Sequence, residues 1–226
     1  RVSLFANYMN GFENEGPRVQ GDGSTVTFQP EQARQWETGV KTRFLNGRVT
    51  STLSYYNIDV SDVIRQDPNE PNSFVQNGEI ESYGVEFSVT ANPVPGMNLT
   101  LGYSHNEAEN IKFNADFDGL RPERAGPKNL FDGWLSYQFT SGKFDGFGFG
   151  FGANYASKHR TLNRVSTGQF ILPEYTIFNG SVYYDSGSFR IDIKANNISN
   201  KEYFTGWSTI NPQQERAVKA SVSYSF

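Results

Sequence analysis

The sequence predicts an all-β protein whose strands form an antiparallel transmembrane β-barrel. Three observations lead to this fold class: a composition rich in aromatic residues and glycine, a regular alternation of apolar and polar residues, and connections that are alternately short and long. The 226 residues include 15% aromatic residues, 22 Gly and only 2 Met, whereas helical bundles are dominated by Ala, Leu, Glu and Lys. No apolar run of about 18 residues is present, so transmembrane helices are not expected.

Charge and residue content argue against several function classes. The net charge of −4 gives no basic surface of the kind that nucleic acids require. The absence of Cys excludes disulfides, thiolate zinc sites and cysteine nucleophiles, and only 2 His are present, so no metal site is expected. Arg1 already lies in a predicted strand, so we expect any targeting signal to lie upstream or to have been removed.

Ten segments carry the two-residue period of strands that have two different faces. Eight alternate cleanly, at residues 2–8, 36–44, 83–91, 97–103, 131–139, 147–155, 189–195 and 218–226. Their apolar phase contains no charged residue, although 19% of the chain is charged. The opposite phase carries Glu37, Lys41, Arg43, Glu86, Asp132, Arg190, Asp192, Lys194 and Lys219. Segments 48–65 and 174–185 alternate less regularly, and the adjacent Tyr55 and Tyr56 predict a β-bulge.

The connections between these strands differ in length in a regular way. Those at 46–47, 93–96, 141–145 and 186–187 are tight, whereas those at 13–33, 67–76, 111–128, 159–172 and 200–214 are long. Outer-membrane barrels have short periplasmic turns and longer extracellular loops. Because backbone groups in lipid must be paired, a spanning sheet closes on itself. The apolar phase then faces lipid, where a Lys or Arg costs about 2–4 kcal/mol at the midplane, and the polar phase faces a lumen. The alternative is a soluble β-sandwich, whose core phase is also free of charge.

Ten strands form either a complete barrel or the last part of a wider one. A narrow barrel fills its interior with large side chains. The inner phase here instead carries Gly39, Gly84, Gly102, Gly148, Gly150, Gly152, Ser221 and Ser223. This pattern favours a wider barrel in which something else occupies the lumen.

Several motifs, in order and spacing, resemble those of the C-terminal part of TonB-dependent outer-membrane receptors of the ferric-siderophore type. They are Pro30-Glu31, Gln35-Trp36-Glu37-Thr38-Gly39-Val40-Lys41, Gly78-Glu79-Ile80-Glu81-Ser82-Tyr83-Gly84-Val85-Glu86, Pro127-Lys128, Leu172-Pro173-Glu174-Tyr175-Thr176, Asn196-Asn197-Ile198 and Lys201-Glu202-Tyr203. Two positions depart from the family pattern, Asn129 after Pro-Lys and the run 197–200 before the Tyr motif. These departures affect the subfamily assignment more than the family assignment.

The resemblance implies that residues 1–226 are the last ten strands of a 22-stranded barrel in the bacterial outer membrane. In that family the barrel surrounds an N-terminal plug that binds the energy-transducing protein TonB, and this chain contains neither the plug nor the earlier strands. The implied protein is a monomeric transporter rather than an enzyme, and it imports a ferric siderophore or a similar chelate without a resident cofactor. Further expected partners are membrane lipid, lipopolysaccharide and the barrel assembly machinery.

The resemblance also suggests roles for individual residues. Glu37 and Glu86 lie on the lumenal phase, and in similar receptors glutamates of these motifs hold plug arginines in ion pairs. The alternative is that they are simply hydrated pore charges. The alternating residues Val218, Ala220, Val222, Tyr224 and Phe226 resemble the last-strand signal read by the assembly machinery.

The long loops provide candidate ligand contacts. Guanidinium groups and aromatic rings suit an anionic, partly aromatic chelate, and the candidates are Arg121, Arg124, Arg160, Arg164, Tyr203 and Trp207. Loop arginines also contact lipopolysaccharide phosphates or water, so this mixture is not specific.

Rival interpretations of the loops come from other function classes. His105 and His159 near the loop end, with Asp67, Asp116 and Asp118, allow a complete ten-stranded barrel that acts as an omptin-like protease or an adhesin. The run Asp116-Phe117-Asp118-Gly119 has the first residues of a calcium loop, but position 127 is Pro where that loop has its Glu. A hydrated turn is the preferred interpretation of this run.

Overall fold

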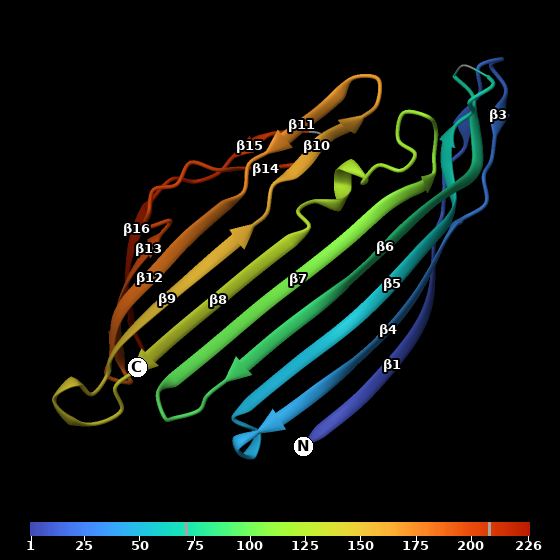
Figure 1. Ribbon diagram of the computed structural model, residues 1–226. Coiled ribbons are helices and arrows are strands. Elements are labelled where there is room, and N and C mark those ends of the chain that lie inside the picture. Colours follow the sequence, from blue (N-terminus) through green and yellow to red (C-terminus); the bar gives the residue numbers. More distant parts are fainter. Residues whose placement is uncertain (71, 208) are drawn as a thin grey trace.

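One curved antiparallel sheet of ten strands dominates the computed structural model, which describes residues 1–70, 72–207 and 209–226 (Figure 1). The sheet order is β1-β4-β5-β6-β7-β8-β9-β12-β13-β16. These strands are β1 (Val2–Glu13), β4 (Glu31–Phe44), β5 (Val49–Gln66), β6 (Phe74–Ala91), β7 (Met97–Lys112), β8 (Asn129–Gln138), β9 (Phe147–Ala156), β12 (Tyr175–Asp185), β13 (Phe189–Asn196) and β16 (Ala217–Tyr224). The ten predicted strands are therefore confirmed.

Within the described residues, short hairpins and single helical turns lie at the ends of the sheet. Three small hairpins are β2 (Arg18–Val19) with β3 (Thr25–Val26), β10 (His159–Arg164) with β11 (Gly168–Leu172), and β14 (Phe204–Thr205) with β15 (Asn211–Pro212). Three single 3₁₀ turns are η1 (Leu45–Gly47), η2 (Glu123–Ala125) and η3 (Gly142–Phe144). No helix in the described part of the chain is long and apolar enough to span a membrane.

The tight turns and the long connections lie at opposite ends of the sheet (Figure 1). Three predicted loops contain strands among the described residues: the segment 159–172 is the β10–β11 hairpin, the segment 13–33 contains β2 and β3, and the segment 200–214 contains β14 and β15. The predicted loop 67–76 is shorter than expected because β6 begins at Phe74. Pro71 and Ser208 of the predicted loops 67–76 and 200–214 lie outside the described residues.

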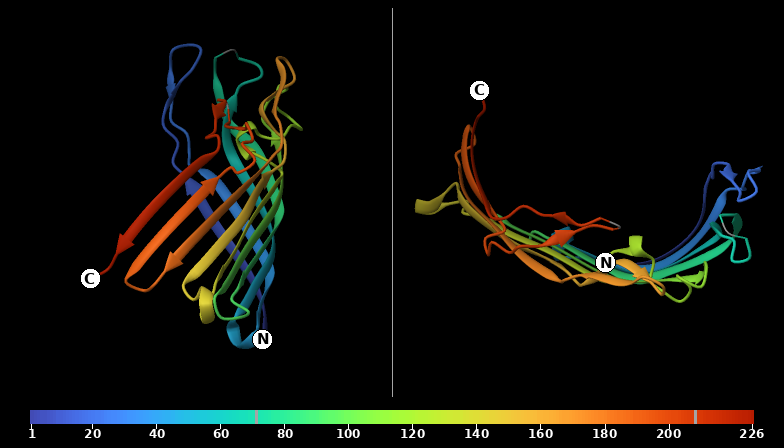
Figure 2. Two further views of the ribbon diagram at one scale, coloured as in Figure 1. Left: turned by 90° about the vertical axis from the view of Figure 1, so that its left-hand side faces the viewer. Right: turned by 90° about the horizontal axis from the view of Figure 1, so that it is seen from above.

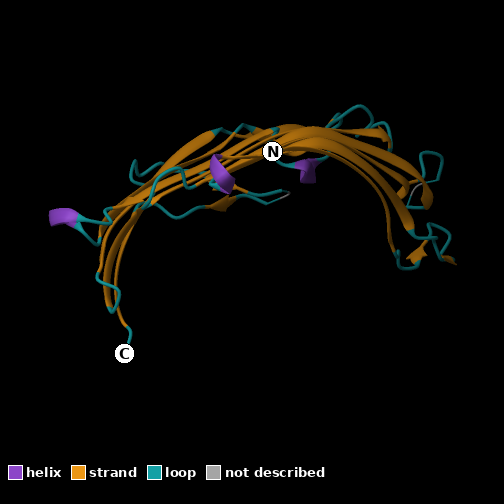
Figure 3. Cartoon of the chain, turned by 90° about the horizontal axis from the view of Figure 1, so that it is seen from below, coloured by secondary structure: helices purple, strands orange, loops and turns teal. Residues whose placement is uncertain are grey.

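The sheet is an open arc rather than a closed barrel or a sandwich. Views from above and from below show β1 and β16 at opposite ends of the arc, with the β14–β15 hairpin on the concave side (Figures 2 and 3). On the apolar phase, Phe149, Ile193 and Val222 are 43%, 45% and 66% exposed. The described residues form no second large sheet, because the three other sheets have two strands each, so the soluble sandwich is wrong. The apolar phase forms an uncovered outer surface of the kind that lipid covers.

The predicted bulge at Tyr55 and Tyr56 is wrong. Both residues lie in unbroken register with β4 and β6, Tyr55 beside Val85 and Tyr56 beside Gly84. Tyr55 points to the outer face, where its ring lies 5.3 Å from that of Trp36, and Tyr56 points to the inner face. The bulge in β5 instead occurs at Asp62, a non-glycine residue with φ of 60° that falls where the register shifts.

The inner glycines do not leave empty space on the concave face. Their number therefore does not indicate a wide barrel. A methyl group on Gly150 or Gly152 would overlap the indole of Trp134, and one on Gly148 would overlap the ring of Tyr183. Gly39, Gly84 and Gly102 are covered in the same way by Phe5, Tyr56 and Asp132. These glycines let large side chains of neighbouring strands lie flat on the inner wall. The open arc, and not the glycine content, indicates that the sheet is part of a wider barrel.

Candidate functional site

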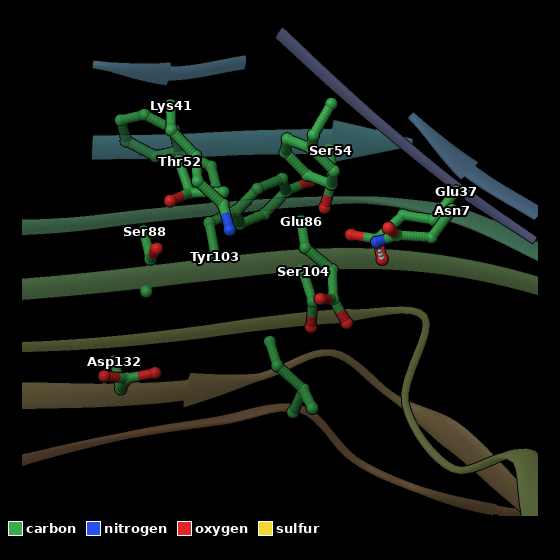
Figure 4. A pocket seen from close by; sticks show the side chains of 14 residues that line it. Asn7, Glu37, Lys41, Thr52, Ser54, Glu86, Ser88, Tyr103, Ser104 and Asp132 are labelled. Carbon is green, nitrogen blue, oxygen red and sulfur yellow. Dashed lines mark hydrogen bonds between the residues drawn. The ribbon is translucent and has the colours of Figure 1, made fainter. Parts of the chain in front are cut away.

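The inner face of β4, β5 and β6 carries the two predicted glutamates around one hollow (Figure 4). Cross-strand register places Glu37 of β4 beside Tyr56 of β5, and Glu86 of β6 beside Ser54 of β5. Because neighbouring strands lie about 4.8 Å apart, two strand spacings and an offset of two residues put the Cα atoms of Glu37 and Glu86 roughly 12 Å from each other. The sequence alternation thus correctly placed both side chains on the lumenal wall.

The hollow of about 480 Å³ is polar and only partly balanced in charge. Asn7 Nδ2 donates a hydrogen bond of 3.5 Å to Glu37 Oε2. Lys41 and Asp132 also line the hollow, and the Lys41 ammonium lies 4.7 Å from the centre of the Phe5 ring. Across residues 1–70, 72–207 and 209–226, neither Glu37 nor Glu86 forms an ion pair within 4.0 Å. Two carboxylates without cation partners on a concave wall are suited to charge-assisted hydrogen bonds from guanidinium groups.

The predicted ligand arginines in the loops are mostly occupied by the protein itself. The Arg121 guanidinium donates to Asn106 O and Oδ1, Ala125 O and Gly126 O at 2.7–3.3 Å, so it fixes the loop that precedes β8. Arg164 pairs with Glu123 at 3.2 Å and lies 5.2 Å from the centre of the Phe117 ring. Arg160 Nε donates to Gln169 Oε1 at 2.9 Å, whereas Arg124 is exposed.

The two aromatic candidates are in different situations. Tyr203 packs against Tyr175 with ring centres 4.5 Å apart, which fixes the start of the loop after β13. Trp207 is 61% exposed in the middle of the same connection, between β14 and β15. The structure therefore does not gather the six candidates into one site, and of them only Arg121 and Arg160 line a common hollow.

Asp–His pairs of a protease are not formed among the described residues. His105 contacts Asn129 and Glu107, and His159 contacts the carbonyl of Gly206. Asp116 accepts hydrogen bonds from the Ser166 backbone N–H and hydroxyl, while Asp118 accepts one from Phe113 N–H and Asp67 one from Asn69 N–H. These carboxylates stabilise loop backbone instead of activating water.

The pKa of the Asp116 carboxyl is shifted by its surroundings. The backbone N–H of Ser166, with the hydroxyl of the same residue and the charge of Arg164, lowers the pKa of this carboxyl below its ordinary value. Asp116 thus remains ionised and links the loop before β8 to the tip of the β10–β11 hairpin, because both hydrogen bonds favour the charged form.

Sequence reasoning missed a polar cluster on the inner wall of β12 and β13. Arg190 bridges Asp185 and Asp192 at 3.0 and 3.1 Å, and its guanidinium lies 4.2 Å from the centre of the Tyr183 ring. Asp192 is buried, and its Oδ1 accepts no hydrogen bond from the described residues. The spacing of Arg190, Asp192 and Lys194 on one phase was visible in the sequence, but the cross-strand partner Tyr183 required the register of β12 with β13.

Four of the predicted assembly residues, Val218, Ala220, Val222 and Tyr224, lie on the outer face of the edge strand β16, and Phe226 follows the end of this strand. Val218, Val222 and Tyr224 are strongly exposed, and β16 pairs with β13 on one side only. Their recognition by other proteins stays a prediction.

Comparison with known families assigns this architecture. The family described as TonB dependent receptor-like, beta-barrel, matches residues 1–198. The chain belongs to the TonB-dependent receptor family. This assignment places the apolar outer face in the bacterial outer membrane, and the adhesin and protease alternatives are not favoured.

Curated relatives of this TonB-dependent receptor chain are siderophore receptors. The ferrioxamine B receptor of Salmonella typhimurium is 27% identical to this chain. The alignment covers 100% of this chain and 32% of that receptor. The metal-pseudopaline receptor of Pseudomonas aeruginosa is 28% identical over 90% of the chain, and the ferrichrome transporter and phage receptor of Escherichia coli is 26% identical over 89%. The chain spans about a third of the length of the relatives it matches.

Solved structures agree on the fold. The ferric-catecholate import receptor of Escherichia coli K12 aligns with a TM-score of 0.84 at 19% identity, covering 100% of this chain and 33% of that one. The ferric preacinetobactin receptor of Acinetobacter baumannii aligns with a TM-score of 0.82 at 22% identity, covering 99% and 34%. The arc therefore has the shape of one segment of a TonB-dependent receptor barrel.

Proposed function

We propose that this chain is the C-terminal barrel segment of a receptor that imports a ferric siderophore or a similar metal chelate, driven by TonB. The observation that carries the proposal is that its full length aligns with about a third of the length of the ferrioxamine B receptor, with residues 1–198 matching the barrel of the family. The iron complex is cargo rather than a resident cofactor. The barrel contributes the scaffold and the outer loops, and we expect no catalytic step.

The open edges of the sheet support closure by further strands. β1 and β16 each pair with one neighbour, which leaves a row of backbone N–H and C=O groups unpaired on the other side. In hydrocarbon each unpaired group costs several kcal/mol, so such an arc is stable only inside a closed barrel. We propose that the complete barrel has 22 strands, that it is a monomer, and that β16 also carries the assembly signal.

The inner wall supports a role for Glu37 and Glu86 in holding a plug. Both carboxylates face the same hollow, and neither has an ion-pair partner within 4.0 Å among the described residues. Arginines of a plug domain would complete these pairs, and such pairs break and re-form at modest cost because the hollow is hydrated. In this mechanism TonB pulls on the plug and a path opens past the rigid wall.

The proposed role is tested in the full-length receptor with Glu37→Ala and Glu86→Ala. We expect a measurable rise in single-channel leakage in planar bilayers and reduced uptake of the radioactive iron chelate. Glu79→Ala is the matched control, because Glu79 lies exposed on the same strand as Glu86, outside the hollow. Unchanged conductance and uptake in both variants would rule out the plug contact.

The transport function itself is tested by deleting the parent gene and measuring growth under iron limitation. Purified ferrioxamine B, ferrichrome and pyoverdine supplied as iron complexes are the probes. Loss of growth on one of them, restored by the intact gene, supports the proposal and identifies the cargo class. Equal growth of the deletion strain on every chelate tested, together with no binding by the purified receptor, would contradict it.

A further inference from the structure

A second hollow lies at the loop-side ends of β8 and β9. Its volume is about 230 Å³, and it lies between the loop before β8, the connection from β9 to β10, and β11. Four cationic side chains line it, those of Arg121, Lys128, Lys158 and Arg160. They come from two segments that are distant in sequence, so the fold itself brings these charges together.

Two buried polar residues also line this hollow and retain unused hydrogen-bonding capacity. His159 is 8% exposed; its Nε2 lies 3.2 Å from the carbonyl oxygen of Gly206 and so carries the donated proton, while Nδ1 has no partner in the described part of the chain. Ser157 is 9% exposed, and its Oγ accepts the Asn129 N–H at 3.0 Å. The serine hydroxyl proton therefore remains available for donation. Buried polar groups are normally satisfied, and Nδ1 of this tautomer is an acceptor, so its missing partner is a hydrogen-bond donor such as the hydroxyl of a protonated phosphate group.

The electrostatics of the hollow favour an anion. Arg121 and Arg160 line the same hollow, and the charge of Arg160 adds to the burial that lowers the pKa of Arg121. Glu107 acts in the opposite direction and pairs with Lys128 at 2.5 Å. One carboxylate does not offset four cations, so a bound anion would relieve the remaining repulsion.

We propose that this hollow binds a small oxyanion of the phosphate type, either free phosphate or a phosphoryl group carried by a lipid. Its size decides against a whole siderophore, because pockets for ligands of that size have volumes of about 300–1,000 Å³. Lys158 and Arg160 supply charge from the rim, Ser157 donates a hydrogen bond from the wall, and His159 Nδ1 accepts one from the hydroxyl of a singly protonated phosphate group. Arg121 supplies fixed positive charge, since its donors are already used by carbonyl oxygens and Asn106.

Calorimetric titration of the purified full-length receptor in neutral detergent tests this site, first with inorganic phosphate and then with lipid A and its dephosphorylated form. Lys158→Gln and Arg160→Gln should each weaken phosphate-type binding by about three- to tenfold, as expected for a partly exposed charge-assisted contact. Lys201→Gln is the matched control, because Lys201 is exposed in a neighbouring loop and does not line the hollow. His159→Gln tests the buried wall, and the two exposed variants keep the test valid if that protein does not fold.

Each outcome of the titration has a definite meaning. Binding of inorganic phosphate that the rim variants weaken supports a free-anion site, and binding of lipid A but not of its dephosphorylated form supports a lipid phosphoryl site. Absence of binding to both, or equal affinity in the rim variants and the control, overturns the proposal. Chelate uptake measured on the same proteins separates this site from the transport function, because uptake can persist when phosphate binding is lost.

Discussion

The two halves of the arc differ in the length of their strands. β5, β6 and β7 have 16–18 residues, whereas β8, β9, β13 and β16 have 8–10. A strand of about 10 residues is enough to cross the bilayer. The long strands therefore continue beyond the bilayer. In the other half of the arc, loops and hairpins extend beyond the ends of the short strands (Figure 1).

The long strands change their pattern where they leave the membrane. On β5, Leu53 and Tyr55 face outward and are followed on the same face by Asn57 and Asp59. On β7, Leu101 and Tyr103 are followed on the outer face by His105, Glu107 and Glu109. The outer face thus changes from apolar to charged just past a row of aromatic residues, as expected where hydrocarbon gives way to water. This inversion explains why segment 48–65 alternated less cleanly in the sequence.

The largest expected effect tests this boundary directly. Leu101→Arg places a charge in the apolar band, and we expect it to lower the free energy of unfolding by about 2–4 kcal/mol. Glu109→Arg, further along the same face, should change it by less than about 0.5 kcal/mol because that position faces water. Denaturant unfolding of the full-length receptor in lipid vesicles measures both values, and equal destabilisation would place the boundary elsewhere.

A second prediction concerns the packed inner wall of the short-stranded half. Gly150→Ala should destabilise the barrel by about 1–3 kcal/mol because the new methyl group overlaps the Trp134 indole. Trp134→Ala removes the obstacle, so the double variant should regain part of this loss in a double-mutant cycle. Strictly additive effects would show that the close approach has no energetic consequence.

A third prediction concerns the loop layer above the short strands. Asn163 is 2% exposed, and its side chain donates to Arg121 O at 2.7 Å and accepts from Gln169 Nε2 at 2.9 Å. Asn163→Ala should lower the local stability of the β10–β11 hairpin by about 1–3 kcal/mol, because it leaves buried groups unpaired. Hydrogen exchange should become faster in residues 159–172 and stay unchanged in β5 and β6; uniform acceleration would mean that the loops and the wall unfold together.

The smallest effect is a pH dependence of the same layer. The folded-state pKa of Asp116 is lowered from its ordinary value of 3.8. Its contribution to stability is therefore present above that ordinary value and is lost as the pH falls through the lower folded-state pKa. Exchange of the Ser166 amide should accelerate only in this acidic range. Asp116→Asn should remove the dependence, whereas a transition near neutral pH would contradict the assignment.

Some side-chain positions could be predicted from the sequence, and others could not. Alternation alone placed Glu37 and Glu86 on the inner wall, because a fixed period of two residues assigns every side chain of a strand to one face. The same reasoning failed for the glycines, since it could not show that Trp134 and Tyr183 from other strands lie over them. It also failed for the loops, where Arg121 looked like a ligand contact but is held by backbone carbonyls and Asn106.

The sequence by itself determined the strands, the two faces and the order of short and long connections, because these depend on local periodicity and on the solvent that each face meets. Only the tertiary structure decided the open arc, the position of the bulge at Asp62, and the meeting of Lys128, Lys158 and Arg160 around a buried histidine. Those features depend on which strands and loops become neighbours in space, and such contacts between distant segments leave no periodic signal in the chain.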